Sequence, residues 1–394
     1  MPLPPHRALS VFYLTSFAVL GVYLPYFNLY LAGLGFTGAQ IGLLSALLPL
    51  CGVIVPTLGG LASERLGRRR GLVVLSTLLA TAAFSGALGT RSFAGVALVV
   101  TAFAALRAPA LPLVEATAME IADGGGPHYG RMRVWGSLSF IVTAWIAGAV
   151  VGRAGDGMVV PLVLGASLLN FGGAWLLPPD RPVTPATAAP PSLAGLVRRA
   201  DVLLFLLACL LSQAAHGPYY VFFSLHLETR GYDAAAIGGL WGLAVLCEVA
   251  MMLRLPALLT RTGPLPILGA SLLVSALRWW ICARSAAPAA LIAAQALHAF
   301  TFAAFHLAAV THTHRIFGAG RRASGQAIYG SAAYGAGNIL GMLGSGLFLD
   351  RLGFQGLFAA AAWVALAGAA LVIDLERRRR RRERAAGAAA PGVL

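Results

Sequence analysis

The stretch GVYLPYFNLYLAGLGFTGAQIG (Gly21–Gly42) recurs 196 positions later as GPYYVFFSLHLETRGYDAAAIG (Gly217–Gly238). The two stretches align without a gap, and nine of their 22 positions are identical. A second pair, VWGS at 134–137 and IYGS at 328–331, follows at an offset of 194. Shared glycines and tyrosines at nearly equal offsets are not expected from chance similarity of apolar segments. The chain therefore consists of two related halves.

Composition places both halves in a membrane. Of 394 residues, 58% are hydrophobic and 11% are charged, and the mean hydropathy is +0.79. This balance is typical of a polytopic membrane protein. Apolar stretches long enough to cross a bilayer predict an all-α fold of twelve transmembrane helices in two parallel six-helix repeats. The predicted spans are 8–32, 38–62, 71–90, 94–121, 134–152, 159–177, 202–226, 236–259, 264–283, 288–312, 327–349 and 354–373.

A proline-rich segment, PPDRPVTPATAAPPSLAG (Pro178–Gly195), separates the sixth and seventh spans. Its composition is typical of a linker. We therefore expect a six-helix bundle over 1–177, a cytoplasmic linker over 178–200 and a second bundle over 201–375. An arginine-rich cytoplasmic tail completes the chain over 376–394.

The charge pattern predicts orientation. The net charge is +15, and all 29 basic residues are arginine. Most arginines fall in alternate loops and in the tail, and only a few fall on the opposite side: Arg91, Arg153, Arg230, Arg284 and Arg351. The positive-inside rule then predicts cytoplasmic termini in the inner membrane of a bacterium. The charge indicates contact with a lipid bilayer rather than with nucleic acid, and we expect a monomer.

Several kinds of chemistry are excluded. Without lysine, the chain can form neither a P-loop nor a Schiff base. The four cysteines are widely spaced within apolar runs, which is neither a metal pattern nor a disulfide framework. We therefore expect no enzyme, no metal and no cofactor.

Three ionisable side chains fall deep inside predicted spans of the second half: Glu248, Arg278 and His298. A rise of about 1.5 Å per residue places them at depths from which they can share one cavity. Burial favours protonation of a carboxylate, a neighbouring arginine opposes it, and histidine titrates near neutral pH. We therefore predict that these residues couple transport to protons. The alternative is a static Glu248–Arg278 pair that only fixes helix packing.

The predicted substrate-binding residues combine charge and aromatic rings. Arg107 and Glu115 lie on the fourth span, and Arg107 can bind a carboxylate in bidentate fashion. The alternative is an ion pair between Arg107 and Glu115 within that helix. The other predicted substrate-binding residues are Tyr23, Phe27, Asn28, His216, Tyr219 and Tyr220. Ordinary bundle packing is the alternative for the aromatic ones.

The loop GLASERLGRRR (Gly60–Arg70) resembles the motif between helices 2 and 3 of major facilitator superfamily transporters, with glutamate where aspartate is usual. We expect Gly60, Glu64, Arg65, Gly67 and Arg68 to form a conformational latch between the cytoplasmic ends. The alternative is that these arginines only set topology.

Further segments resemble the phenylpropionate permease family, which is similar in plan to lactose permease and the nucleoside–proton symporters. They are YGRMRVWGS (129–137), AAHGPYY (214–220), LCEVA (246–250), LRWW (277–280) and QALHAFTFAAFHLAAV (295–310). The resemblance implies proton-driven uptake of a small organic solute, with an aromatic carboxylate as the expected class, by rocking of the two bundles. It also likens Arg278 and His298 to the proton site of lactose permease, except that the tenth span carries no carboxylate between His298 and His306.

Other functions stay open at this point. A drug or metabolite exporter of the same fold often has a Gly-Pro signature on helix 5, which residues 133–152 lack. A sugar or nucleoside symporter would use the same aromatic walls. A non-transporting membrane sensor would need an added soluble domain.

Overall fold

The computed structural model describes residues 3–180, 194–318 and 321–389, and the central part of the predicted linker lies outside these ranges. In the described part, eleven helices are long and apolar enough to cross a membrane. The last of them, Ser324–Arg381, contains two of the predicted spans, which meet at a kink at Gly353 (φ 62°, ψ 176°). With its two arms counted separately, the helices correspond to the predicted twelve. The all-α fold is confirmed.

The N-terminal half begins with two helices of 29 residues each, α1 (Pro5–Gly33) and α2 (Gly38–Leu66). The fourth predicted span is divided between two helices, because it contains prolines at 109 and 112. The remaining elements of this half are α3 (Arg69–Ser85), η1 (Gly86–Leu88), α4 (Phe93–Arg107), α5 (Ala110–Asp123), α6 (Tyr129–Ala154), η2 (Asp156–Met158) and α7 (Val159–Trp175).

The C-terminal half follows the same plan, with more interruptions. Two of its helices contain a π-helical segment, η3 (Ala299–Ala304) and η5 (Ser331–Gly337). The final helix continues through the arginine-rich tail to Ala389. The other elements are α8 (Ala194–Val197), α9 (Ala200–Ala215), α10 (Gly217–Glu228), α11 (Ala234–Thr262), α12 (Pro264–Arg284), α13 (Pro288–His298), α14 (Phe305–Phe317), α15 (Arg322–Gly330) and α16 (Asn338–Ala389).

The repeat that opens the sequence forms the same turn in both halves. Gly35 and Gly231 have φ values of 84° and 82°, a region that favours glycine. Two residues later, Thr37 and Asp233 cap the next helix, each side chain accepting a hydrogen bond from a backbone N–H three residues on. The identical residues of the repeat therefore reflect one helix–turn–helix unit used twice.

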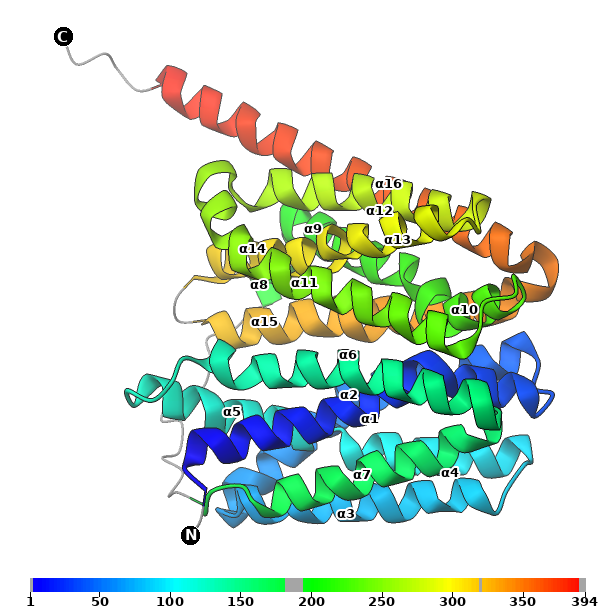
Figure 1. Ribbon diagram of the computed structural model, residues 1–394. Coiled ribbons are helices and arrows are strands. Elements are labelled where there is room, and N and C mark those ends of the chain that lie inside the picture. The colour runs from blue at the N-terminus through cyan, green and yellow to red at the C-terminus, as the bar shows by residue number, and fades with distance from the viewer. Residues whose placement is uncertain (1–2, 181–193, 319–320, 390–394) are drawn as a thin grey trace.

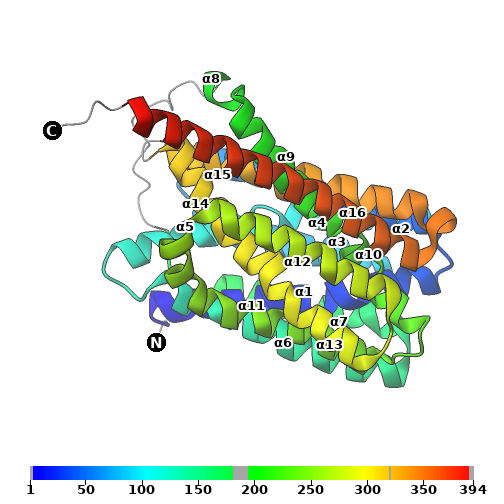
Figure 2. The ribbon, with the colours of Figure 1, turned by 90° about the horizontal axis from the view of Figure 1, so that it is seen from above.

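The two halves lie one above the other, and both termini lie at the left-hand end of the helices in this view, which we call the terminus end (Figure 1). Viewed along the stacking direction, the C-terminal half covers the N-terminal half (Figure 2). At the end remote from the termini, buried residues of both halves form one hydrophobic core. At the terminus end each half has its own core, one around Phe12 and Val114 and the other around Phe205 and Phe305. The halves are therefore joined at one end and separate at the other.

Glycines permit the joined end to close. An added Cβ at Gly42 of α2 would lie 2.8 Å from Gly346 Cα of α16. An added Cβ at Gly238 of α11 would overlap both the Tyr26 hydroxyl and the Ala144 carbonyl. That hydroxyl lies 2.7 Å from the Ala144 carbonyl oxygen and 3.0 Å from that of Ala234, and so links three helices from both halves. Backbones approach this closely only where side chains are absent.

Candidate functional site

Arg278 lies on α12 and is fully buried. Its guanidinium donates to three groups of the neighbouring helix: Nε to the Ala294 carbonyl at 2.8 Å, Nη1 to the Thr301 hydroxyl at 3.2 Å and Nη2 to Gln295 Oε1 at 3.1 Å. The same group stacks 4.4 Å from the ring centre of Tyr219 and 4.3 Å from that of Trp279. Hydrogen bonds and cation–π contacts together offset much of the cost of burying this charge.

His298 connects Arg278 to Glu248. Arg278 Nη1 lies 2.8 Å from His298 Nδ1, and His298 Nε2 lies 3.6 Å from Glu248 Oε1. A guanidinium N–H can only donate, so we assign His298 Nδ1 as the acceptor. In the neutral ring the proton then sits on Nε2 and points toward the carboxylate. If Nδ1 were protonated as well, its N–H would point at the N–H of Arg278 Nη1, and two hydrogen-bond donors would face each other.

The three predicted proton-coupling residues therefore lie in one chain of contacts. Among the described residues, the ionic partner of Glu248 is His298, and no direct Glu248–Arg278 ion pair is formed. The static pair considered from the sequence is thus replaced by an indirect arrangement, because Arg278 turns toward α13 and η3.

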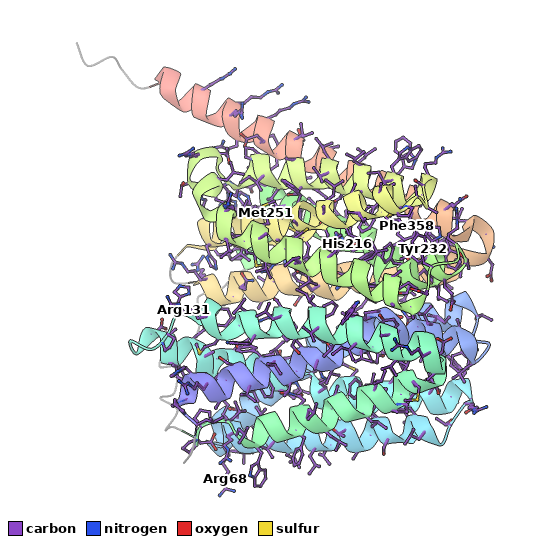
Figure 3. All side chains as sticks on the ribbon, viewed as in Figure 1. Arg68, Arg131, His216, Tyr232, Met251 and Phe358 are labelled. Carbon is purple, nitrogen blue, oxygen red and sulfur yellow. The ribbon has the colours of Figure 1, made fainter. Side chains whose placement is uncertain are left out.

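His216 lies inside the C-terminal half, at the junction of α9 and α10 (Figure 3). Its Nδ1 donates to the Ser212 carbonyl at 2.8 Å, which leaves the Nε2 lone pair free. Nε2 is buried and has no partner among the described residues. Its ring packs edge-on against Trp279, with centroids 4.9 Å apart. His216 is therefore positioned to accept a hydrogen bond from water or from a solute.

Two other predicted residues of this half lie around the same cluster. The Tyr219 hydroxyl donates to Gln295 Oε1 at 3.3 Å, and its ring lies 4.5 Å from that of Trp241. Tyr220 is half-buried, with its ring 5.9 Å from that of His216. These rings form one wall beside Arg278.

The N-terminal half contains a cavity of about 250 Å³, lined by Tyr23, Phe103, Arg107 and parts of α2 and α5. Arg107 Nη2 donates to the Ser16 carbonyl at 2.7 Å and to the Ser16 hydroxyl at 3.1 Å. The rings of Tyr23 and Phe103 stack with centroids 6.0 Å apart. The lining of the cavity thus combines one guanidinium, that of Arg107, with the aromatic rings of Tyr23 and Phe103.

Glu115 does not join this cavity. It accepts a hydrogen bond from the Tyr129 hydroxyl of α6 at 3.3 Å, whereas Arg107 contacts α1. Among the described residues there is accordingly no Arg107–Glu115 ion pair, since the break between α4 and α5 separates the two side chains. Phe27 packs into the shared core against Tyr23, with ring centroids 4.4 Å apart.

Asn28 fastens the two halves together. Its amide donates to the backbone carbonyls of Tyr220 at 3.3 Å and Val221 at 2.9 Å, and its oxygen accepts from the Ser45 hydroxyl at 3.2 Å. Its hydrogen-bonding groups are therefore occupied by protein at the joined end.

Arg133 is a site residue that the sequence reasoning counted only as a topology signal. Its guanidinium lies 3.9 Å from the ring centre of Phe17. Although Arg133 belongs to the N-terminal half, its helix α6 packs against α11, which carries Glu248. The sequence offered one clue, because Arg133 lies directly before a predicted span rather than in the middle of a loop.

The predicted latch loop lies at the terminus end, where Figure 3 places Arg68 and Arg131. Gly67 ends α2 with φ 61°, and both Arg65 and Arg68 are exposed. Gly60 has open space around its Cα, and the side chain of Glu64 lies outside the described part. The last two arginines of this loop do make contacts: Arg69 pairs with Glu120 at 2.8 Å, and the backbone N–H of Arg70 donates to the Asp180 carboxylate.

Comparison with known proteins settles the family. The model of the MFS_1 like family, a group within the major facilitator superfamily, matches residues 6–360. The chain belongs to this family. A probable 3-phenylpropionic acid transporter of Escherichia coli (strain K12) is 30% identical over 382 residues, which cover 93% of this chain and 97% of that protein. The resemblance inferred from the sequence is thereby confirmed.

This MFS_1 like protein is also similar to a sugar permease in sequence and to a nucleoside transporter in structure. A maltose permease of Geobacillus stearothermophilus is 25% identical over 274 residues, covering 68% of each chain. A mutant form of the nucleoside transporter NupG superposes with a TM-score of 0.85 at 18% identity, covering 94% of this chain and all of that one. The NupG match shows the shared fold, and the relatives as a group are membrane transporters.

Proposed function

We propose that the protein is a proton-coupled symporter that takes up a small aromatic carboxylate by rocking of its two halves. The observation that carries this proposal is the contact chain Arg278–His298–Glu248. An intramembrane carboxylate whose nearest polar neighbour among the described residues is a neutral histidine can gain and lose a proton at modest cost. Because Arg278 holds His298 Nδ1 as an acceptor, we assign Glu248 as the proton carrier, with His298 Nε2 3.6 Å from its carboxylate.

Charge balance supports coupling between the halves. Glu248 is linked to Arg278 of its own half through His298, and its helix α11 packs against α6, which carries Arg133 of the other half. When the halves rock, Arg133 moves relative to Glu248, so the electrostatic support for the ionised form changes. Proton binding and release then follow the conformational cycle, as symport requires.

The substrate class is supported by the N-terminal cavity. Its guanidinium, Arg107, can pair with a carboxylate, and the rings of Tyr23 and Phe103 can stack on an aromatic group. A relative that shares 30% of its residues is named as a probable 3-phenylpropionic acid transporter. We propose that Tyr219, Tyr220 and His216 contact the same solute from the opposite half, while Phe27 and Asn28 shape the joined end and Glu115 positions Tyr129.

We further propose that the protein works as a monomer in the inner membrane with both termini in the cytoplasm. The separate end of the structure would then be open to the cytoplasm. In the opposite state the loop from Gly60 to Arg70 would close that end. Glu64, Arg65 and Arg68 would then contact the C-terminal half, and Gly60 and Gly67 would leave room for this contact.

The experiment is uptake of labelled 3-phenylpropionate into proteoliposomes with an acidic exterior. We expect accumulation above the equilibrium level, since inward proton flow drives the solute, and collapse of that accumulation on addition of an uncoupler. Accumulation that survives the uncoupler would contradict proton coupling.

A nucleoside substrate is the second candidate, favoured by the high structural similarity to NupG. A thermal-shift comparison of 3-phenylpropionate, a nucleoside and maltose separates the classes, because a ligand of the folded state raises the melting temperature. We expect the aromatic acid to give the largest rise. A larger rise with a nucleoside would transfer the proposal to that class.

A further inference from the structure

A second histidine centre lies two helical turns from His298, closer to the terminus end. His306 is the second residue of α14, and its Nδ1 lies 2.8 Å from the Tyr334 hydroxyl and 3.2 Å from the Tyr329 hydroxyl. Tyr329 is 1% exposed, whereas His306 and Tyr334 are half-buried. Two hydroxyls therefore hold one ring nitrogen, and the other nitrogen, Nε2, makes no hydrogen bond to the described residues.

Irregular backbone brings these side chains together. The π segment η3 (Ala299–Ala304) ends two residues before His306, and the π segment η5 (Ser331–Gly337) contains Tyr334. π-helical turns are rare, and they are found frequently at functional sites because the extra residue re-aims its neighbours. Two such turns on adjacent helices converge on this one imidazole.

The centre adjoins the Glu248 site. Phe302 stacks between the two histidines, with ring centroids 5.5 Å from His298 and 6.4 Å from His306. Glu248 lies on α11, which packs against η3, the segment that ends two residues before His306. The apolar ring of Phe302 lies between the two imidazoles, so a proton that moves from Glu248 to His306 has to travel around this ring.

The centre also lies where the halves separate. Gly335, next to Tyr334, packs against Val53 of α2 in the N-terminal half. Beyond this point, toward the termini, the two halves have separate cores. His306 therefore lies beside the boundary between the joined end and the separate end.

We propose that His306, positioned by Tyr329 and Tyr334, accepts the transported proton from Glu248 and releases it at the open end. This inference rests on the proposed symport function. In the step, protonated Glu248 loses one proton through cavity water and the Tyr334 hydroxyl, and His306 gains one, giving a carboxylate and an imidazolium. The imidazolium then loses a proton from Nε2 to water, and the ring returns to its neutral form.

His306 can carry the charge that His298 cannot. Tyrosine hydroxyls rotate, so they can donate to a neutral ring and accept from an imidazolium. Arg278, by contrast, can only donate to His298 Nδ1. The titratable groups that face His306 are Tyr329 and Tyr334, with His298 beyond Phe302. Among the described residues His306 forms no ion pair, so its imidazolium would rely on the two hydroxyls for stabilisation.

The test compares net uptake with counterflow exchange of 3-phenylpropionate in proteoliposomes, at low and high concentrations of an impermeant buffer, HEPES. Exchange needs no proton release, whereas net uptake does. For His306→Ala at low buffer we expect net uptake to fall at least about tenfold, with exchange unchanged, since a positioned proton acceptor accelerates transfer by that much or more. High HEPES should restore net uptake, because the buffer replaces the missing acceptor.

His314→Ala, on the same helix, is the matched control and should behave as wild type in both assays. Tyr334→Phe removes one hydroxyl and should lower net uptake in the same buffer-dependent way. If His306→Ala yields no folded protein by size-exclusion chromatography, Tyr334→Phe takes its place in the comparison with wild type. Wild-type net uptake in His306→Ala at low buffer would overturn the inference, and so would an equal loss of exchange. A wild-type protein that moves no protons with its solute would instead overturn the proposed function, and the inference with it.

Discussion

A single arginine inside the bilayer shows how this fold accommodates charge. An isolated arginine at the centre of a membrane helix costs about 3 kcal/mol even on insertion scales. Arg278 offsets this cost with hydrogen bonds to four groups of α13 and η3 and with two aromatic faces. One consequence is structural, since α12 is fastened to its neighbour. The other is chemical, since the tautomer of His298 is fixed.

Replacing Arg278 by lysine tests both consequences. Lysine keeps the charge but lacks the planar fork, so it cannot serve Ala294, Gln295 and His298 together. We expect Arg278→Lys to lower the melting temperature and to reduce net proton-driven uptake at least about tenfold, because buried acceptors left unpaired cost about 1–3 kcal/mol each. Thermal unfolding and proteoliposome uptake measure the two effects.

The matched control is Arg284→Lys in the last turn of the same helix. Arg284 is exposed and stacks on Trp280, with its guanidinium 4.6 Å from the ring centre. It should show neither effect. Equal stability and uptake in the two variants would contradict the role given to the Arg278 fork.

At this scale the sequence predicted which residues meet but not how they pair. Counting residues along each span placed Glu248, Arg278 and His298 at compatible depths, and the structure brings them into one chain of contacts. The direction of a long side chain is set by tertiary packing, so the choice of His298 as the link could not be read from spacing. The break at Pro109, which parts Arg107 from Glu115, was visible in the sequence, but its effect on their pairing was not.

At the scale of helices, glycines decide which surfaces can meet. Gly238 of α11 packs on Tyr26 and Ala144, while its neighbour Gly239 has open space around its Cα. A side chain at Gly238 must push the halves apart at the joined end. A side chain at Gly239 has no atoms within contact distance of its Cβ.

Gly238→Leu should therefore favour states in which the joined end is open. We expect a cysteine introduced near this end to react faster with an impermeant maleimide in Gly238→Leu than in the parent protein. Gly239→Leu is the control and should leave the labelling rate unchanged. Equal labelling of both variants would show that the contact at Gly238 does not hold this end closed.

Helix positions were largely predictable, whereas irregular turns were not. Runs of about 20 apolar residues and the repeated glycines at 35 and 231 located the spans and their connections. The π segments η3 and η5 left no composition signal, because an extra residue in a helical turn is selected by packing between helices. The centre formed by His306 and Tyr334 depends on those turns, so the sequence alone did not reveal it.

At the scale of the whole molecule, one shared core and two separate cores correspond to one of the two states that the proposed rocking mechanism requires. The repeat in the sequence predicts two equivalent bundles, and equivalent bundles can close at either end. Which end is closed depends on small differences in packing and charge between states, so the sequence does not specify it. The glycine contacts at 42 and 238 stabilise the state in the structure.

If Glu248 carries the coupled proton, removing its charge should separate uphill transport from exchange. Uphill accumulation and counterflow exchange of 3-phenylpropionate are measured for Glu248→Gln, with Glu228→Gln at the exposed end of α10 as the control. Glutamine mimics the protonated carboxyl but cannot release a proton. We expect Glu248→Gln to lose accumulation and keep exchange, and the control to keep both. Normal uphill accumulation by Glu248→Gln would contradict this role of Glu248.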